Sequence, residues 1–183
     1  MEYLIVLLPL LGSIISGFFG KRLGDKPCQI LTCSLVSVSA VLSLLIFFKV
    51  FTQDYSSNKL IFSWISSGDF QVNWSINIDP LTSVMLVVVS LISSIIHFYS
   101  IGYMSHDPHK PRFMAYLSLF TFAMLTLVTA DNFLQLFFGW EGVGLCSYLL
   151  IGFWYKKPSA NSAAIKAFIV NRVGDFGFAL GIF

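Results

Sequence analysis

Charged residues are scarce in this chain, and their scarcity excludes most soluble classes of protein. They make up 11% of the 183 residues, against 56% for hydrophobic residues, whereas soluble domains average about 25% charged residues. The mean hydropathy of +0.80 likewise indicates an integral membrane protein. Because a membrane-spanning helix takes roughly 20 residues, a handful of spans uses most of the chain. A separate soluble catalytic domain is therefore excluded.

Several binding motifs are also missing. No run of Lys and Arg exceeds a pair and the net charge is only +2, which argues against nucleic-acid binding. The three cysteines, Cys28, Cys33 and Cys146, lack the paired spacing of zinc or iron–sulfur sites, so we interpret them as small hydrophobic residues. The sequence has no phosphate-binding glycine-rich loop, no dinucleotide fingerprint and no histidine pair spaced as in haem-binding bundles. We therefore expect neither a metal site nor a cofactor in this chain.

Long apolar runs are what the sequence has instead. Six of them are long enough to cross a bilayer as helices, and Gly, Pro, Asn and Asp punctuate the segments between them. They span residues 3–19, 29–51, 81–101, 112–130, 132–155 and 162–183. We predict an all-α fold over residues 1–183, a polytopic transmembrane helix bundle with about six spans. The last run reaches Phe183 without a polar flank, from which we expect a longer parent protein.

Positive charges gather in alternate connections between these runs. Seven of the eleven Lys and Arg residues lie in the first, third and fifth connections: Lys21, Arg22, Lys26, Lys110, Arg112, Lys156 and Lys157. By the positive-inside rule these connections face the cytoplasm or mitochondrial matrix, and the N-terminus faces the opposite side. Usage rich in Phe, Ile, Ser and Lys indicates an AT-rich genome. We expect a multi-pass protein of the bacterial inner membrane, with the mitochondrial inner membrane as the alternative.

The second connection, residues 52–80, is the only long one. Apolar and polar residues alternate along residues 70–76, which is typical of a strand with one apolar face. The turn residues "SSGD" separate this segment from the apolar stretch "LIFSWI". We predict a short extramembrane β-hairpin on the outer surface, with Phe70, Val72, Trp74 and Ile76 on its apolar face.

A single carboxylate, that of Glu141, stands near the centre of the fifth run, "LQLFFGWEGVGLCSYLLIGFWY". A charge at this depth is costly, and it marks a functional site by default. Burial favours the neutral acid and a nearby cation favours the carboxylate, so a movable partner would make Glu141 take up and release a proton. Its neighbours at helical spacing supply no cation. We therefore expect the partner on another span, and the polar residues of the sixth run are candidates. A purely structural role is the alternative.

Polar residues also interrupt the sixth and third runs. The sixth holds Lys166, Asn171, Arg172 and Asp175, and both Asn171 and Arg172 share a helix face with Asp175. Arg172 and Asp175 either belong to a polar pathway or join helices structurally. Lys166, nearer the cytoplasmic end, either snorkels to the interface or takes up protons. His97, in the third run, is either a proton relay or a hydrogen-bonded interfacial residue.

Two segments resemble a known family. They are "HFYSIGYMSHDPHKPRFMAYLSLFTFAMLTLVTADNFLQLFFGWEGVGLCSYLLIGFWY" and "KAFIVNRVGDFGFALGIF". Both resemble the largest antiporter-like subunit of respiratory complex I, called subunit L in bacteria and subunit 5 in mitochondria. The resemblance implies that Glu141 is the proton-pumping glutamate of the fifth span and that Asp175, with Arg172 beside it, belongs to a central polar axis. It also implies that the lysine modulating the glutamate lies on a seventh helix, beyond Phe183.

The resemblance implies a membrane-arm subunit that couples electron transfer from NADH to quinone to proton translocation. Its partners would be other membrane subunits of complex I and the lipid bilayer, with no nucleic acid and no small-molecule substrate other than protons. NADH, FMN, iron–sulfur clusters and quinone would bind elsewhere in the complex, so this chain would hold no redox centre. From the residues and the resemblance together, we expect Glu141, Asp175, Arg172 and Lys166 to carry the translocation. The alternatives are a subunit of an Mrp-type Na⁺/H⁺ antiporter and a non-conducting assembly or scaffold piece.

Overall fold

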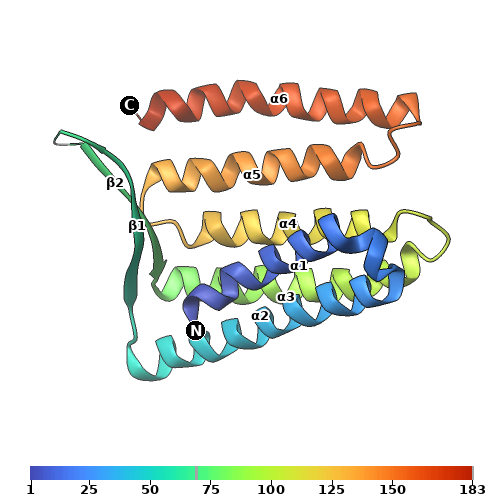
Figure 1. Ribbon diagram of the computed structural model, residues 1–183. Coiled ribbons are helices and arrows are strands. Elements are labelled where there is room, and N and C mark those ends of the chain that lie inside the picture. The colour runs from blue at the N-terminus through green and yellow to red at the C-terminus, as the bar shows by residue number, and fades with distance from the viewer. Residues whose placement is uncertain (69, 183) are drawn as a thin grey trace.

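The computed structural model describes residues 1–68 and 70–182. It contains six helices and one hairpin, in the order α1 (Glu2–Leu23), α2 (Asp25–Gln53), β1 (Ser57–Ser67), β2 (Phe70–Ile78), α3 (Pro80–Tyr103), α4 (Lys110–Val128), α5 (Phe133–Ile151) and α6 (Pro158–Ile182). The helices run side by side, and the hairpin crosses one end of the bundle (Figure 1). The predicted helix bundle with a hairpin is confirmed.

Five of the described helices, α1 to α5, are long and apolar enough to cross a membrane. The sixth, α6, is 25 residues long, but Lys166, Arg172 and Asp175 interrupt its apolar stretch. It nevertheless packs against α5 and runs alongside it (Figure 1). The chain is therefore a multi-pass membrane protein with five clear spans and a sixth, more polar helix in register with them.

The first four helices form the packed part of the bundle, and the last two extend it sideways. α1 packs against α2 and α4, α3 lies between α2 and α4, and α5 joins α4 to α6. The buried apolar core lies toward the hairpin and comprises Ile5, Val6, Ile46, Val50, Ile76, Ile78, Leu86 and Leu125. In contrast, α6 buries only Ala164 and Asp175. It is the edge of the described bundle.

Serine hydroxyls join the helices of the packed part. Ser39 donates a hydrogen bond of 2.7 Å to the Ile5 carbonyl of α1, and Ser16 donates one of 2.8 Å to the Pro111 carbonyl of α4. Hydrocarbon offers these groups no competing water, and hydroxyl side chains between helices are a common way to hold membrane bundles together. These contacts are neutral, and each hydroxyl has a protein acceptor.

The hairpin is longer than the short one predicted. β1 has 11 residues and β2 has 9, and the two strands are antiparallel. Gly68, at the end of β1, has a φ of 58°, a conformation that glycine adopts without strain. Register shifts interrupt the ladder on the β1 side only. On the predicted apolar face of β2, Val72 and Ile76 are buried and Phe70 is exposed, and Ser75 of the other face is buried too.

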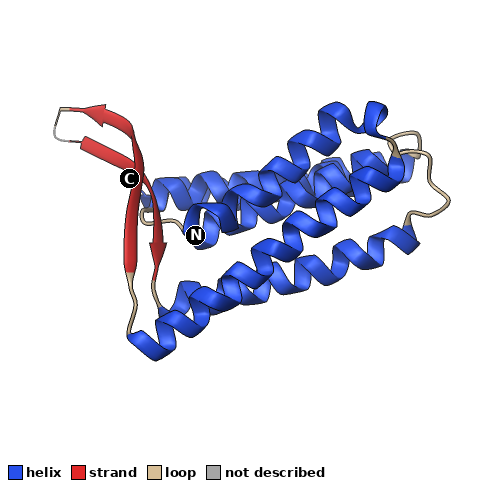
Figure 2. Ribbon diagram, turned by 60° about the horizontal axis from the view of Figure 1, so that its bottom comes forward, coloured by secondary structure: helices blue, strands red, loops and turns tan. Residues whose placement is uncertain are grey.

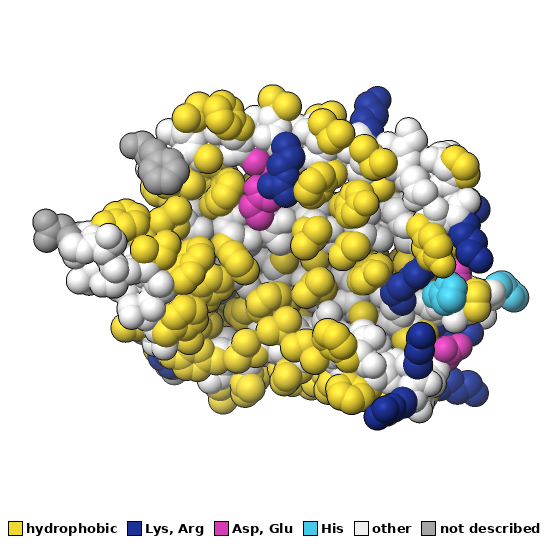
Figure 3. Space-filling model, turned by 45° about the horizontal axis from the view of Figure 1, so that its top comes forward, with side chains coloured by type: hydrophobic (Ala, Val, Ile, Leu, Met, Phe, Trp, Pro, Cys, Tyr) yellow, Lys and Arg dark blue, Asp and Glu magenta, His cyan; other side chains and the backbone are white. Residues whose placement is uncertain are grey.

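The three basic connections lie together at the end of the bundle opposite the hairpin (Figures 1 and 2). Lys and Arg side chains accordingly gather at one end of the face drawn in Figure 3, while hydrophobic side chains cover most of the rest. Acidic and basic side chains meet at one isolated place within that hydrophobic area (Figure 3). The arrangement is that of a membrane protein with one basic end and one charged cluster within its hydrophobic surface.

Candidate functional site

α5 is anchored at its outer end and carries Glu141 halfway along. Asn132 caps the helix, because its side chain accepts a hydrogen bond of 2.8 Å from the Gln135 amide. The Gln135 side chain in turn accepts a bond of 3.1 Å from the Ser75 amide and donates one of 2.7 Å to the Ser75 carbonyl of β2. At a rise of about 1.5 Å per residue, Glu141 lies about 12 Å along α5 from Phe133. The hairpin thus fixes the level of Glu141.

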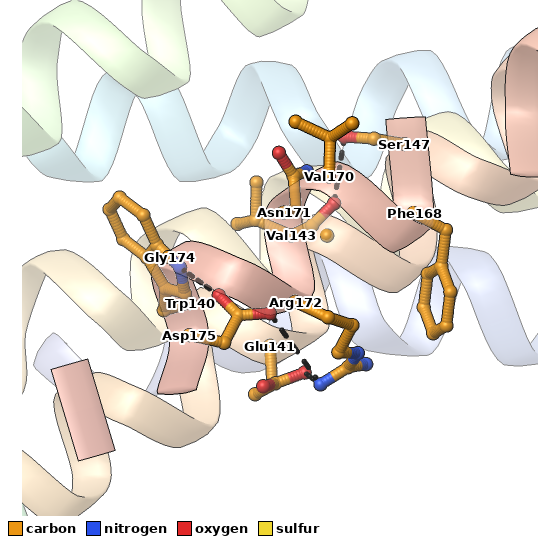
Figure 4. A pocket seen from close by; sticks show the side chains of 11 residues that line it. Trp140, Glu141, Val143, Ser147, Phe168, Val170, Asn171, Arg172, Gly174 and Asp175 are labelled. Atoms are coloured by element: carbon orange, nitrogen blue, oxygen red, sulfur yellow. Dashed lines mark hydrogen bonds and ion pairs between the residues drawn. The ribbon is translucent and has the colours of Figure 1, made fainter. Parts of the chain in front are cut away.

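Close packing against α4 fixes the rotation of α5. A Cβ atom at Gly139 would come within 2.7 Å of the Leu127 backbone, and one at Gly142 within 3.1 Å of the Ala123 Cβ. Only small residues allow two helices to approach in this way. With Gly139 against α4, the Glu141 side chain projects toward α6 (Figure 4).

Arg172 of α6 lies between two carboxylates. Its Nη1 donates to Glu141 Oε2 of α5 and lies 3.6 Å from Asp175 Oδ2 on its own helix. The partner of Glu141 was expected on another span, with the polar residues of the sixth run as candidates; within the described residues that partner is Arg172. The lysine expected beyond Phe183 falls outside those residues. One nitrogen therefore serves both acids (Figure 4).

Trp140 holds the second carboxylate, and the sequence analysis missed it. Its Nε1 donates a hydrogen bond of 2.8 Å to Asp175 Oδ1, the oxygen that does not face Arg172. Hydrocarbon offers a tryptophan N–H no acceptor, so a tryptophan next to a mid-membrane glutamate was the available signal. Asp175 is 8% exposed: Oδ1 accepts the tryptophan hydrogen bond, and Oδ2 faces the arginine as an ion pair.

A cavity of about 250 Å³ opens at this cluster. It is lined by Trp140, Glu141, Val143, Gly144, Ser147, Phe168, Val170, Asn171, Arg172, Gly174 and Asp175. The side chain of Arg172 is 45% exposed, that of Glu141 23% and that of Asp175 10%. The Phe168 ring lies 4.5 Å from the guanidinium carbon, close enough for a cation–π contact. The guanidinium thus has room to move between its two acids.

The remaining predicted site residues are dispersed. Asn171 lines the cavity but forms no hydrogen bond with Asp175 among the described residues. Lys166 is exposed on α6 and does not line it. In the described part of the chain, no group of three His, Cys, Asp or Glu side chains is placed to hold a metal ion. The structure therefore assembles Glu141, Arg172 and Asp175 and leaves Lys166 outside.

His97 lies in a separate polar cluster between α3 and α4. Its Nδ1 is 2.8 Å from the Ser93 carbonyl and its Nε2 is 3.0 Å from the Ser118 hydroxyl. The Ser93 hydroxyl is 2.5 Å from that of Thr121. His97 is 0% exposed, so it is hydrogen-bonded as one interpretation held, but it is buried in the bundle and is not interfacial.

Two family models match the chain. One is described as NADH-ubiquinone oxidoreductase (complex I), chain 5 N-terminus, and matches residues 64–114. The other is described as NADH:quinone oxidoreductase/Mrp antiporter, TM, and matches residues 130–183. The second match includes the whole Glu141–Arg172–Asp175 cluster.

Curated relatives match the chain over its full length. NADH-ubiquinone oxidoreductase chain 5 of Triticum aestivum is 60% identical over 183 residues, which are 100% of this chain and 27% of the relative. NADH-quinone oxidoreductase subunit L of Rickettsia bellii (strain RML369-C) is 55% identical over 179 residues, 98% of this chain and 28% of the relative. The chain thus spans little more than a quarter of the length of these relatives.

Solved structures share the fold at low identity. A chain of the membrane-bound sulfane sulfur reductase, an archaeal respiratory membrane complex, matches with a TM-score of 0.81 and 15% identity over 98% of this chain and 36% of that chain. A chain of the Mrp complex from Dietzia sp. DQ12-45-1b matches with a TM-score of 0.78 and 20% identity over 98% of this chain and 18% of that chain. The helix arrangement is therefore one that several membrane complexes use.

Proposed function

Since the chain belongs to the family of the antiporter-like chain 5 or subunit L of NADH-quinone oxidoreductase, we propose that it translocates protons in the membrane arm of respiratory complex I. Electron transfer from NADH to quinone takes place in other subunits, and this chain contributes no redox step. The single observation that supports the proposal is the position of Arg172 between the carboxylates of Glu141 and Asp175, halfway through the bundle.

The mechanism uses two positions of one cation. While Arg172 pairs with Glu141, the positive charge favours the ionised carboxylate. When the guanidinium moves to Asp175, Glu141 is left without a cation in an apolar setting, and the neutral acid becomes the favoured form. Glu141 then takes up a proton, and the return of Arg172 expels it.

The supporting residues make the second position available. Trp140 donates a hydrogen bond to Asp175 Oδ1, which stabilises the carboxylate without adding a charge. Oδ2 therefore stays directed toward Arg172. Lys166 lies on α6 between the basic end of the bundle and the cavity. We keep it as a proton-uptake residue, because its long side chain can reach the interface: its ammonium group would pass a proton inward, and the resulting amine would take one from solvent.

The test is the substitution Glu141→Gln in the full-length subunit within its complex. Glutamine keeps the size of the side chain but takes up no proton, so we expect the protons translocated per electron pair to fall, while Glu141→Asp retains part of the translocation. The measurement is proton uptake by inverted vesicles during NADH oxidation, normalised to the amount of assembled complex. An unchanged ratio in Glu141→Gln would rule out the proposed role of this residue.

A Na⁺/H⁺ antiporter of the Mrp type is the second candidate. It is favoured by the description of the family model over residues 130–183, which names both classes. Such a subunit would use the same glutamate without a redox partner. Sodium-driven proton movement in vesicles without NADH would support it, and its absence would leave the complex I assignment.

The partners and the membrane complete the proposal. We propose contacts with other membrane subunits of complex I, in keeping with the relatives' names. For the membrane we propose the bacterial inner membrane first and the mitochondrial inner membrane second, although plant and bacterial relatives match almost equally, at 60% and 55%. The genetic code and neighbouring genes of the locus would distinguish the two.

A further inference from the structure

A second cavity lies between α4, α5 and α6 at the basic end of the bundle. Its volume is about 480 Å³, within the range of about 300–1,000 Å³ that small-molecule sites occupy. It shares no lining residue with the cavity at Glu141. The proton-translocating cluster therefore does not account for it.

Arg112, on the first turn of α4, brings a positive charge to this cavity. Its Nη2 donates a hydrogen bond of 2.9 Å to the Phe153 carbonyl, and its guanidinium carbon lies 4.5 Å from the Phe153 ring and 5.3 Å from the Tyr155 ring. Its Nε is buried without an acceptor. Over residues 1–68 and 70–182, Arg112 forms no ion pair with a carboxylate. The charge is therefore held in place and not neutralised.

The acidic residue close to Arg112 is engaged elsewhere. Asp107, in the connection before α4, accepts hydrogen bonds of 2.9 Å from Trp154 Nε1 and 2.7 Å from the His109 amide. Burial raises the pKa of Asp107, but these two hydrogen bonds and the nearby positive charges outweigh it, so the pKa lies below its ordinary value. Asp107 is thus an ionised acid with donors of its own, and Arg112 keeps its capacity for another anion.

The lining of the cavity is polar on one side and apolar on the other. Tyr116 and Asn161 provide polar groups alongside Arg112, whereas Leu149 and Ile165 provide an apolar flank. Ile165 is 51% exposed within the described chain, so the apolar flank is the open side of the cavity. A ligand that fits both parts carries a polar anionic group and a hydrocarbon portion.

We propose that this cavity binds a phosphate-bearing anion at Arg112, supplied by the headgroup of an anionic phospholipid. A guanidinium group pairs well with phosphate oxygens, and the pairing is stronger away from bulk water. Basic pockets between transmembrane helices at the cytoplasmic or matrix side are the places where such headgroups bind. The cavity also lies beside the unpaired Lys156 and Lys157 connection, which strengthens the attraction for an anion.

Photo-crosslinking in the purified complex with the full-length subunit tests this site. The probe is phosphatidylglycerol with a photoreactive group on its headgroup, and labelled peptides are identified by mass spectrometry. We expect labelling of the segments that contain Tyr116 and Asn161, and a loss of about tenfold in Arg112→Gln, which corresponds to one lost charged contact of about 1.4 kcal/mol. Arg22→Gln, which removes an exposed arginine from the same end, should leave the labelling unchanged.

A second variant and two competitors make the outcome decisive. Asn161→Asp adds a negative charge to the rim, and we expect it to reduce labelling even if Arg112→Gln fails to assemble. Unlabelled phosphatidylglycerol should compete, whereas phosphatidylcholine and inorganic phosphate should not. Full competition by inorganic phosphate would identify a free-anion site and overturn the lipid assignment. Undiminished labelling in both assembled variants would overturn the site itself.

Discussion

The polar group around His97, between α3 and α4, is neutral and closed, whereas the one around Glu141, between α5 and α6, is charged and partly open. His97 is 0% exposed; its Nδ1 faces the Ser93 carbonyl and hydroxyl, and its Nε2 faces the Ser118 hydroxyl. Arg172 is 45% exposed on its side chain, and its Nη1 is shared by two acids. Both groups are polar clusters in an apolar bundle, but only the charged one offers its central side chain, Arg172, a choice between two carboxylates.

The difference shows how a membrane bundle can keep the polar groups that join its helices apart from a polar group that can change its pairing. A neutral donor with one acceptor has one low-energy arrangement, so it joins helices and does little else. A cation between two carboxylates has two arrangements of similar energy, and a small change in its surroundings selects between them. The proposed translocation would therefore use the charged cluster at the edge of the described bundle, whereas the neutral cluster joins helices at its centre.

Removal of the shared cation is expected to have the largest effect. Arg172→Gln leaves Glu141 and Asp175 close together without a positive charge, so at least one acid stays protonated and cannot release its proton. We expect the rate of proton translocation to fall by at least about tenfold, a change of about 1.4 kcal/mol or more in the barrier. The measurement is proton uptake by vesicles, with Arg22→Gln as the matched control. Full activity in Arg172→Gln would mean that Glu141 works without an arginine.

Loss of the tryptophan donor is expected to have an intermediate effect. Trp140→Phe keeps an aromatic ring beside Phe178 but removes the hydrogen bond to Asp175, which favours the ionised acid. We expect a decrease of about threefold in translocation per assembled complex. A purely structural role would lower the yield of assembled complex and leave the translocation per complex unchanged.

Disruption of the neutral cluster is expected to have the smallest functional effect. His97→Leu leaves the Ser118 hydroxyl without its partner, which should lower the free energy of unfolding by about 1–3 kcal/mol. Translocation per assembled complex should stay within about twofold of the wild type. Thermal denaturation and vesicle assays on the same preparation separate the two quantities. A loss as large as that in Arg172→Gln would place His97 in the proton path and erase the contrast between the two regions.

Local patterns were enough to predict most of the elements. Apolar runs with polar breaks predicted the helices, and alternation predicted the hairpin. On its apolar face Val72 and Ile76 are buried, whereas Phe70, the first residue of β2, is exposed. The place of Glu141 in the middle of a span also followed from sequence, since it depends only on counting residues along one helix.

Contacts between helices were harder to predict. The pairing of Arg172 with Asp175 follows from three-residue spacing and is present at 3.6 Å. The contact of Arg172 with Glu141 depends on how α6 is rotated against α5, which no spacing within one helix determines. Trp140 was missed for the same reason, since Asp175 lies on the neighbouring helix, and the burial of His97 depends on the packing of α3 against α4.

The anchoring of α5 bears on how the proposed switch would work. Gln135 ties the outer end of α5 to β2, and Gly139 packs directly on the backbone of α4. Within the described residues α6 packs mainly against α5 and buries two residues. Under the proposed function α5 would therefore act as a stator and α6 as a rotor. A torque applied to α6 would turn Arg172 relative to Glu141 and so select the protonation state of the glutamate.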